Sequence, residues 1–294
     1  MSTPAFITVD GRRTRVRVAG NPSHPPVVLI HGIGRSLEDW ELQFPKLTAA
    51  HRVIALDMPG SGFSARSPLR STLSVLARGV LDTLDALGEH RPAHLVAHSL
   101  GGAVALQLLV SSPHRVASLV LVDSAGFGAE ITLPLRLLTV PVLGRLMISR
   151  TTRASVRMVE PLGFADPALA TDARIEHALA VARQPDTNIV MWETARELAT
   201  PRGAKAAWRE RLLESVAEHV KPTLIMWGDR DAILPVKHFD AARSAMPHAQ
   251  AHLFRGVGHL PQLESPDEFA DRVLAFLTDV NGHPAHRKVD TNAQ

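Results

Sequence analysis

Short apolar runs recur along the first half of the chain, and each one ends abruptly at a polar residue. Four of them read PVVLI, RVIAL, HLVA and VASLVLV, and they end next to His31, Asp57, His98 and Asp123. Uninterrupted runs of this length are typical of strands that are buried on both faces, as in a parallel sheet. A fifth run, RTRVRVAG, alternates polar and apolar residues after an Asp-Gly turn and predicts a half-exposed strand.

Between these runs the apolar positions follow helical spacing. Residues 73–88 carry leucine or valine every three or four positions, and residues 100–110 are apolar apart from Gly101, Gly102 and one glutamine. Strand and helix therefore alternate, which predicts a mostly parallel, doubly wound sheet with helices on both faces. The same rhythm returns near the end of the chain in PTLIMWG, in AQAHLF and in a helix expected over 267–280.

The alternation of strand and helix is interrupted over residues 124–220. No strand-like run occurs there, and prolines separate apolar, helical segments. We expect this stretch to form a separate helical unit. It would be inserted into an α/β domain built from residues 1–123 and 221–280. The polar tail NGHPAHRKVDTNAQ, residues 281–294, is expected to be disordered.

Composition is typical of globular proteins and excludes several functions. Of the 294 residues, 45% are hydrophobic and 21% are charged, and the net charge is +3. The scattered arginines do not form the basic patch that nucleic-acid binding needs. The sequence has no cysteine, so disulfides, thiolate metal sites and cysteine nucleophiles are excluded. We expect neither a metal nor another cofactor.

No part of the sequence predicts a membrane span. The N-terminus lacks an apolar leader region, and the most apolar stretch, residues 131–148, contains two prolines and two arginines. We therefore expect a cytoplasmic protein that acts on a small molecule. The sequence leaves its oligomeric state open.

A serine stands where one buried strand meets the next helix. The sequence there reads HLVAHSLGGAVALQLL, with Ser99 between the small residues Ala97 and Gly101. A tight turn from strand to helix lifts the hydroxyl clear of the sheet, and the helix N-terminus favours negative charge beside it. Because such a turn needs small residues two positions before and after the serine, Ser99 is a candidate nucleophile.

Five motifs in one order make the chain resemble the α/β-hydrolase superfamily. They are HGIG at 31–34, DMPGSGFS at 57–64, the turn at Ser99, GDRD at 228–231 and GH at 258–259. The resemblance covers the chain outside residues 124–220 and the tail. It implies the α/β-hydrolase fold, with a helical cap inserted after the sixth strand. The turn departs mildly from the usual G-x-S-x-G pattern, because Ala97 replaces the first glycine.

The resemblance also implies a catalytic triad in the chain order nucleophile, acid, base: Ser99, Asp231 and His259. Ser99 would attack, His259 would accept and later return its proton, and Asp231 would orient the imidazole. The acid has alternatives. Asp231 lies at the position that the family pattern requires, whereas Asp229 suits a turn and Asp123 ends the preceding buried strand.

An oxyanion hole is implied in the same way, formed by the backbone N–H groups of Ile33 and Leu100. His31 is expected to brace the loop that carries Ile33 rather than to take part in chemistry. His98 either lines the substrate pocket or only completes the turn. The segment DMPGSGFS is expected to be structural, with Asp57 accepting backbone hydrogen bonds.

A helical cap above Ser99 would enclose an apolar pocket that suits an acyl chain or an aromatic ring. Trp192 in the cap, Leu260 beside the base and His98 are candidate pocket residues. The resemblance thus implies a serine hydrolase similar to carboxylesterases and lipases. It would cleave a carboxylic ester with an apolar acyl group through a covalent acyl-enzyme.

Two other functions remain open. Hydrolases that cleave a C–C bond in vinylogous 1,5-diketone ring-cleavage products share the length, cap and triad order. Their turn usually reads GNSMGG and a tryptophan usually follows the histidine, whereas here the turn reads AHSLGG and Leu260 follows. The second is a non-catalytic small-molecule binding protein on the same fold. Dehalogenases and epoxide hydrolases are disfavoured because residue 99 is not aspartate and the chain has no tyrosine.

Overall fold

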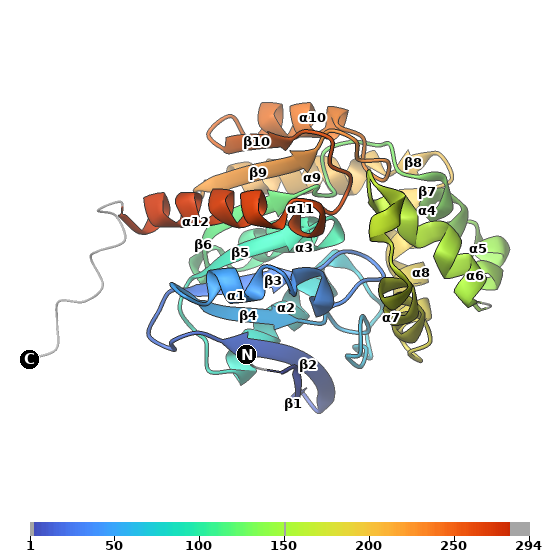
Figure 1. The fold of residues 1–294 in the computed structure, drawn as a ribbon, viewed down its shortest axis with the longest axis horizontal. Helices are drawn as coiled ribbons and strands as arrows, with labels where there is room; N and C mark the ends of the chain where they lie inside the picture. The colour runs from blue at the N-terminus through green and yellow to red at the C-terminus, as the bar shows by residue number, and fades with distance from the viewer. Residues whose placement is uncertain (1–2, 150, 283–294) are drawn as a thin grey trace, which may run out of the picture.

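A computed structural model describes residues 3–149 and 151–282. Within them, one sheet has the strand order β1-β2-β4-β3-β5-β6-β9-β10 (Figure 1). Its strands are β1 (Ala5–Val9), β2 (Arg12–Ala19), β3 (Pro26–Ile30), β4 (Arg52–Leu56), β5 (Ala93–His98), β6 (Val116–Val122), β9 (Thr223–Gly228) and β10 (Gln250–Phe254). Because the chain winds outward in both directions from β3, the sheet is doubly wound, as the sequence predicts.

The sheet is mostly parallel. Strands β4, β3, β5, β6, β9 and β10 pair in parallel, in this order across the sheet. Strands β1 and β2 form an antiparallel edge that joins β4. Strands β3, β5 and β6 are buried along their whole length, which explains their uninterrupted apolar runs. The hydrophobic pattern does not predict β1, because most of its residues are exposed or half-buried at the sheet edge.

Helices cover both faces of the sheet, and alternate residues of β3 face the two cores. Val28 and Ile30 pack in the first core, whereas Val27 and Leu29 pack in the second. The first core is covered by α2 (Leu73–Ala86), α3 (Leu100–Ser111), α9 (Ala206–Ala217) and α10 (Lys237–Ala245). The second is covered by the short 3-10 helix η1 (Leu37–Trp40), α1 (Phe44–Leu47) and α12 (Pro266–Gly282).

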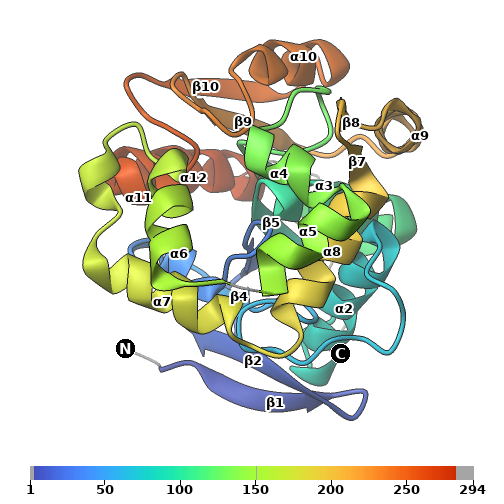
Figure 2. The ribbon, with the colours of Figure 1, turned by 90° about the vertical axis from the view of Figure 1, so that its right-hand side faces the viewer.

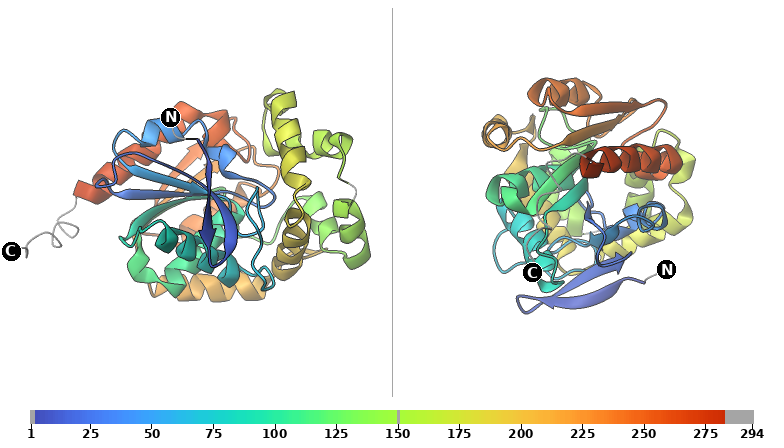
Figure 3. Two further views of the ribbon diagram at one scale, coloured as in Figure 1. Left: turned by 90° about the horizontal axis from the view of Figure 1, so that it is seen from below. Right: turned by 90° about the vertical axis from the view of Figure 1, so that its left-hand side faces the viewer.

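Between β6 and β9 the chain leaves the sheet and builds a group of helices at one end of it (Figures 2 and 3). They are α4 (Leu133–Leu138), α5 (Pro141–Ser149), α6 (Arg153–Val159), η3 (Glu160–Gly163), η4 (Pro167–Leu169), α7 (Asp172–Ala182) and α8 (Thr187–Leu198). The apolar stretch 131–148 is divided between α4 and α5. None of the helices described here is long and apolar enough to cross a bilayer.

One hairpin was not expected from the sequence, and two boundaries differ from the expected ones. A hairpin of two-residue strands, β7 (Ala199–Thr200) and β8 (Gly203–Ala204), follows α8, and strands so short leave no periodicity in the sequence. Helix α9 buries Leu212 and Val216 in the first core beside α3, so we propose that the cap ends at β8 rather than at residue 220. Helix α12 includes residues 281 and 282, and the rest of the predicted tail lies outside the described residues.

Candidate active site

Ser99 lies at the junction of β5 and α3, with a backbone conformation that few side chains adopt. Its φ is 54° and its ψ is −118°, and its N–H donates to the carbonyl of Val122 at 2.9 Å. Leu100 is the first residue of α3, so its N–H belongs to the helix turn that lacks intrahelical acceptors. The serine therefore stands at a helix N-terminus, where the backbone N–H groups favour negative charge.

Two glycines let the backbone close tightly around this serine. A Cβ on Gly101 would lie 2.6 Å from the carbonyl oxygens of Ile30 and His31, so α3 presses directly on the end of β3. A Cβ on Gly32 would lie 3.2 Å from Cβ of Ser99. The loop after β3 is therefore packed against the nucleophile. The oxyanion hole from the N–H groups of the next residue in this loop, Ile33, and of Leu100 stays a prediction.

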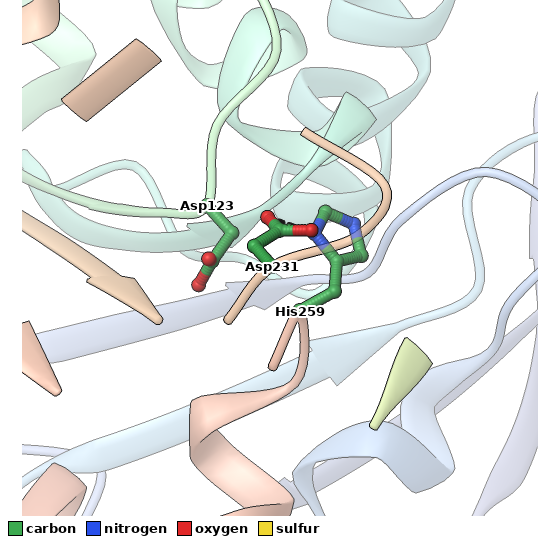
Figure 4. A group of neighbouring side chains, drawn as sticks. All are labelled: Asp123, Asp231 and His259. Atoms are coloured by element: carbon green, nitrogen blue, oxygen red, sulfur yellow. Dashed lines mark hydrogen bonds and ion pairs between the residues drawn. The ribbon is translucent and has the colours of Figure 1, made fainter. Parts of the chain in front are cut away.

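His259 and Asp231 come together from two loops, one after β9 and one after β10. Nδ1 of His259 donates to Oδ2 of Asp231 at 2.7 Å, and both residues are buried (Figure 4). The other carboxylate oxygen, Oδ1, accepts the N–H groups of Ile233 at 2.7 Å and Leu234 at 2.9 Å. Because Nδ1 is engaged by the carboxylate, Nε2 of His259 is the nitrogen left for proton transfer.

The surroundings of Asp231 favour its charged form. Burial alone would raise the pKa of Asp231, but the electrostatic interaction and hydrogen bond with His259 and the backbone N–H of Leu234 outweigh it and hold the pKa below its usual value. An ionised carboxylate in this position orients the imidazole and stabilises its charged form during proton transfer.

His98 contacts the loop that carries His259. Its Nε2 donates to the backbone carbonyl of His259 at 2.7 Å, and the two rings lie 4.6 Å apart between centroids. Burial, together with the neighbouring charge of His259, lowers the pKa of His98 to about 3, so its ring is neutral. The contact with His259 is neither of the two roles left open by the sequence, and the role of pocket residue stays a prediction.

The loop of the base is also held by residues that the sequence pattern did not identify. The N–H of His259 donates to the carbonyl of Gly163 in the cap at 2.9 Å. Glu264, in the short helix α11 (Pro261–Glu264), accepts the N–H groups of Gly258 and of Ala165, both at 2.8 Å. The cap segment 163–165 and the histidine loop are thus fixed to each other.

The two other candidate acids take different positions. Asp229 accepts the N–H of Gly256 at 2.7 Å and pairs with Arg255, which is the turn role expected for it. Asp123 lies beside the dyad, and Asp231 lies between it and His259 (Figure 4). Donor atoms of these three residues lie within 4.8 Å of one another, so by geometry alone the group could hold a metal ion.

The turns around the site are built as the motifs predict. His31 donates from Nδ1 to the carbonyl of Gly32 at 2.8 Å and accepts the N–H of Met58 on Nε2 at 3.1 Å. Asp57 accepts the N–H groups of Leu37 at 2.8 Å and Phe63 at 2.9 Å. Both side chains are fully buried and occupied by backbone partners, so they brace the loops that surround Ser99.

The cap helix α8 reaches the loop that carries Ile33. Sδ of Met191 lies 3.2 Å from the point where Gly34 would carry a Cβ, a contact that the sequence pattern did not reveal. Trp192 packs in the cap's own cluster, and Leu260 packs in a small cluster with Phe164. Neither contact tests whether Trp192 or Leu260 lines a substrate pocket, and both assignments stay predictions.

An ion-pair network joins the cap to the same loop. Arg35 pairs with Asp39 at 2.7 Å and, across the junction, with Glu160 at 3.0 Å. A cavity of about 190 Å³ lies beside these residues, and charged side chains such as Glu38 and Arg174 contribute to its wall. The junction is therefore polar and tightly paired next to the candidate oxyanion loop.

Comparison with known proteins establishes the family. A family model described as "alpha/beta hydrolase fold" matches residues 25–266. The chain belongs to the α/β-hydrolase family. The family and the fold class expected from the five motifs are thus both confirmed.

The proteins that are similar to this chain are named for different reactions. The chain is 36% identical over 277 residues to the dihydrolipoyllysine-residue acetyltransferase component of an acetoin cleaving system from Pseudomonas putida, covering 93% of this chain and 69% of that one. It is 27% identical to lipase 1 of Psychrobacter immobilis, with coverages of 87% and 78%. A meta-cleavage product hydrolase from Pseudomonas fluorescens IP01 matches with a TM-score of 0.79 and 26% identity, covering 94% of this chain and 98% of that one.

Proposed function

We propose that this α/β hydrolase cleaves a carboxylic ester with an apolar acyl group through a covalent acyl-enzyme. The observation that carries the proposal is the buried contact of 2.7 Å between His259 and Asp231, formed in the family's order with Ser99 on its strained turn. A serine hydroxyl is a weak nucleophile unless a base of this kind is held beside it.

In the proposed reaction Oγ of Ser99 attacks the ester carbonyl carbon while its proton passes to Nε2 of His259. The resulting oxyanion is stabilised by the N–H groups of Ile33 and Leu100. The C–O bond to the alcohol then breaks, and the alcohol leaves with the proton from His259. A water molecule, deprotonated by His259, then attacks the acyl carbon. The bond from this carbon to Oγ of Ser99 breaks as His259 returns the proton to Oγ, and the carboxylic acid is released.

The contacts between the cap and the core favour an apolar and uncharged substrate. Helix α8 brings Met191 against the loop of Ile33, and several arginines at the junction with the core are already paired. Arg35 is paired with Asp39 and Glu160, and Arg66 is paired with Glu193 at 3.2 Å. A neutral acyl group needs no further cation in such a site.

C–C bond hydrolysis is the second candidate, and the match to a meta-cleavage product hydrolase favours it. Its dienoate substrates carry a carboxylate, which would have to compete with Glu160 or Glu193 for an arginine. Leu260 also replaces the tryptophan that usually follows the histidine in that group. These two features rank ester hydrolysis first. A binding role without catalysis ranks third, because it needs neither the strained serine nor the buried dyad.

A panel of p-nitrophenyl esters from acetate to palmitate, assayed beside a ring-cleavage dienoate and a fluorophosphonate probe, tests the proposal. We expect turnover of at least one ester and covalent labelling of Ser99. Cleavage of the dienoate in the absence of ester turnover would move the function to C–C hydrolysis. A folded protein that neither reacts with the probe nor turns over any substrate would support binding alone.

A further inference from the structure

Asp123 is a buried carboxyl group with one oxygen unexplained. It directly follows β6, has no exposed surface, and its φ is 42°. Oδ1 accepts the N–H of Gly228 at 3.0 Å. Within the described part of the chain, no donor reaches Oδ2, which is also buried. An ionised carboxylate would leave this oxygen without a partner, which is costly away from water.

A second buried carboxyl group lies close to Asp123. Asp123 and Asp231 are both buried, and an oxygen of one lies within 4.8 Å of an oxygen of the other (Figure 4). Two carboxyl groups this close in a buried place do not both ionise, and one of them keeps a proton. Asp231 accepts three N–H groups, from Ile233, Leu234 and His259, whereas Asp123 accepts one. The negative charge therefore belongs on Asp231.

We propose that Asp123 is a positioning residue of the active site: a neutral carboxylic acid that donates its Oδ2 proton to Asp231. The donated hydrogen bond satisfies the remaining oxygen and fixes the carboxylate that orients His259. This assigns Asp123 the role of donor to the catalytic acid, in place of the rival acid that the sequence left open. The inference rests on the triad part of the proposed function and not on the choice of ester as substrate.

The carboxylates beside Asp123 favour its neutral form. Burial and the charge of Asp231 raise the pKa of Asp123 well above its usual value, and the carboxylate of Glu264 on α11 acts in the same direction. His259 lies on the far side of Asp231 (Figure 4), and His238 also interacts electrostatically with Asp231. The N–H of Gly228, which donates to Asp123, acts in the opposite direction.

The proton can be observed directly in the wild-type protein. In protein labelled with ¹³C at the aspartate carboxyl carbons, the Asp123 resonance is assigned through its own backbone, so no variant is needed. We expect it to stay at the protonated position between pH 5 and 7, while Asp231 stays at the ionised position. An Asp123 resonance at the ionised position at pH 6 would overturn the proposal. So would a stoichiometric divalent metal in the purified protein whose removal by EDTA shifts this resonance.

Turnover provides the second test, in which two replacements of Asp123 are compared. Asparagine can accept from Gly228 and donate to Asp231 as a neutral aspartic acid does, whereas alanine can do neither. We expect Asp123→Ala to lower kcat about tenfold or more with little change in KM, and Asp123→Asn to restore kcat to within about threefold of wild type.

The outcomes of the two tests separate this proposal from the proposed function. If Asp123→Asn is as damaging as Asp123→Ala, an ionised Asp123 is required and the proposal is wrong. If wild-type protein turns over no ester and ignores the probe, the proposed function fails. The carboxyl titration then still decides where the proton lies, since it needs no substrate.

Discussion

At the scale of single residues, strained backbone holds the chemistry in place. Ser99 and Asp123 both have a positive φ, at 54° and 42°, although neither is glycine. Each such conformation costs about 1–3 kcal/mol and persists only where the surrounding structure enforces it. Here backbone hydrogen bonds between the ends of β5 and β6 hold both conformations. The N–H of Ser99 donates to the carbonyl of Val122, and the carbonyl of Ser99 accepts the N–H of Ala125.

Replacing the nucleophile should separate the strain from the chemistry. We expect Ser99→Ala to fold and to lower ester turnover by about 10⁴-fold or more, because alanine keeps the turn but removes the attacking oxygen. Steady-state kinetics and circular dichroism measure the two effects. Ser111→Ala, at the far end of α3, is the matched control and should retain activity. A Ser99→Ala protein with a tenth of wild-type turnover would rule out the proposed mechanism.

The acid can be distinguished from its neighbour two residues earlier. Asp231→Asn should lower kcat by about 10³–10⁴-fold, because His259 loses the carboxylate that fixes its tautomer. Asp229→Asn should leave turnover near wild type, since Asp229 accepts from Gly256 and does not contact the imidazole. Kinetics of the two purified variants under identical conditions decide the assignment, and the reverse order of effects would transfer the role to Asp229.

At the scale of elements, the cap is tied to the core through Arg35 and Glu160. We expect Glu160→Gln to lower the free energy of unfolding by about 1–3 kcal/mol, because it removes a charged hydrogen bond that is mostly shielded from water. Urea unfolding measures this change. Glu176→Gln removes an exposed pair with Arg153 and should change stability by less than about 0.5 kcal/mol. Equal effects of the two replacements would show that the cap junction is not tied by this pair.

Most of the core elements could be predicted because a buried strand consists of consecutive, mostly apolar residues. Strands β3, β5 and β6 are buried along their whole length and are mostly apolar, so their runs could be identified directly. Strand β1 could not, because an exposed edge strand lacks that pattern. Strands β7 and β8 have two residues each, which is too short for an alternation of polar and apolar residues to repeat.

The site divides in the same way. Ser99 stands in a local turn motif, and the contact of His259 with Asp231 was expected from the order of the family's motifs. The supports of that pair come from residues distant in sequence, such as Gly163, which binds the N–H of His259. Glu264 is close in sequence to His259, but its second partner, Ala165, lies 99 positions away. Such contacts arise from how the cap docks, and no local spacing encodes them.

At the scale of the whole molecule, folding encloses several histidines in their neutral form. Burial lowers the pKa of His51 and of His238, and it lowers the pKa of His98 to about 3. In the unfolded chain a histidine takes up a proton near its ordinary pKa of about 6.5. Between these values the unfolded state binds more protons than the folded state, so stability rises with pH across that window.

His98 should therefore make the protein lose stability on mild acidification. Below its ordinary pKa each pH unit costs about 1.4 kcal/mol for one such histidine, until the folded pKa is reached. Asp39, whose charge favours protonation, and Arg35, whose charge opposes it, both act on His98, so their effects partly offset each other. In urea unfolding we expect the stability gap between wild type and His98→Asn to shrink by roughly 1–2 kcal/mol from pH 7 to pH 5, since asparagine does not titrate. Val96→Ala, a buried replacement on the same strand, is the control whose gap should not depend on pH. If the gap of His98→Asn is the same at both pH values, His98 is not held neutral by burial, and its neutrality cannot account for the way it supports His259.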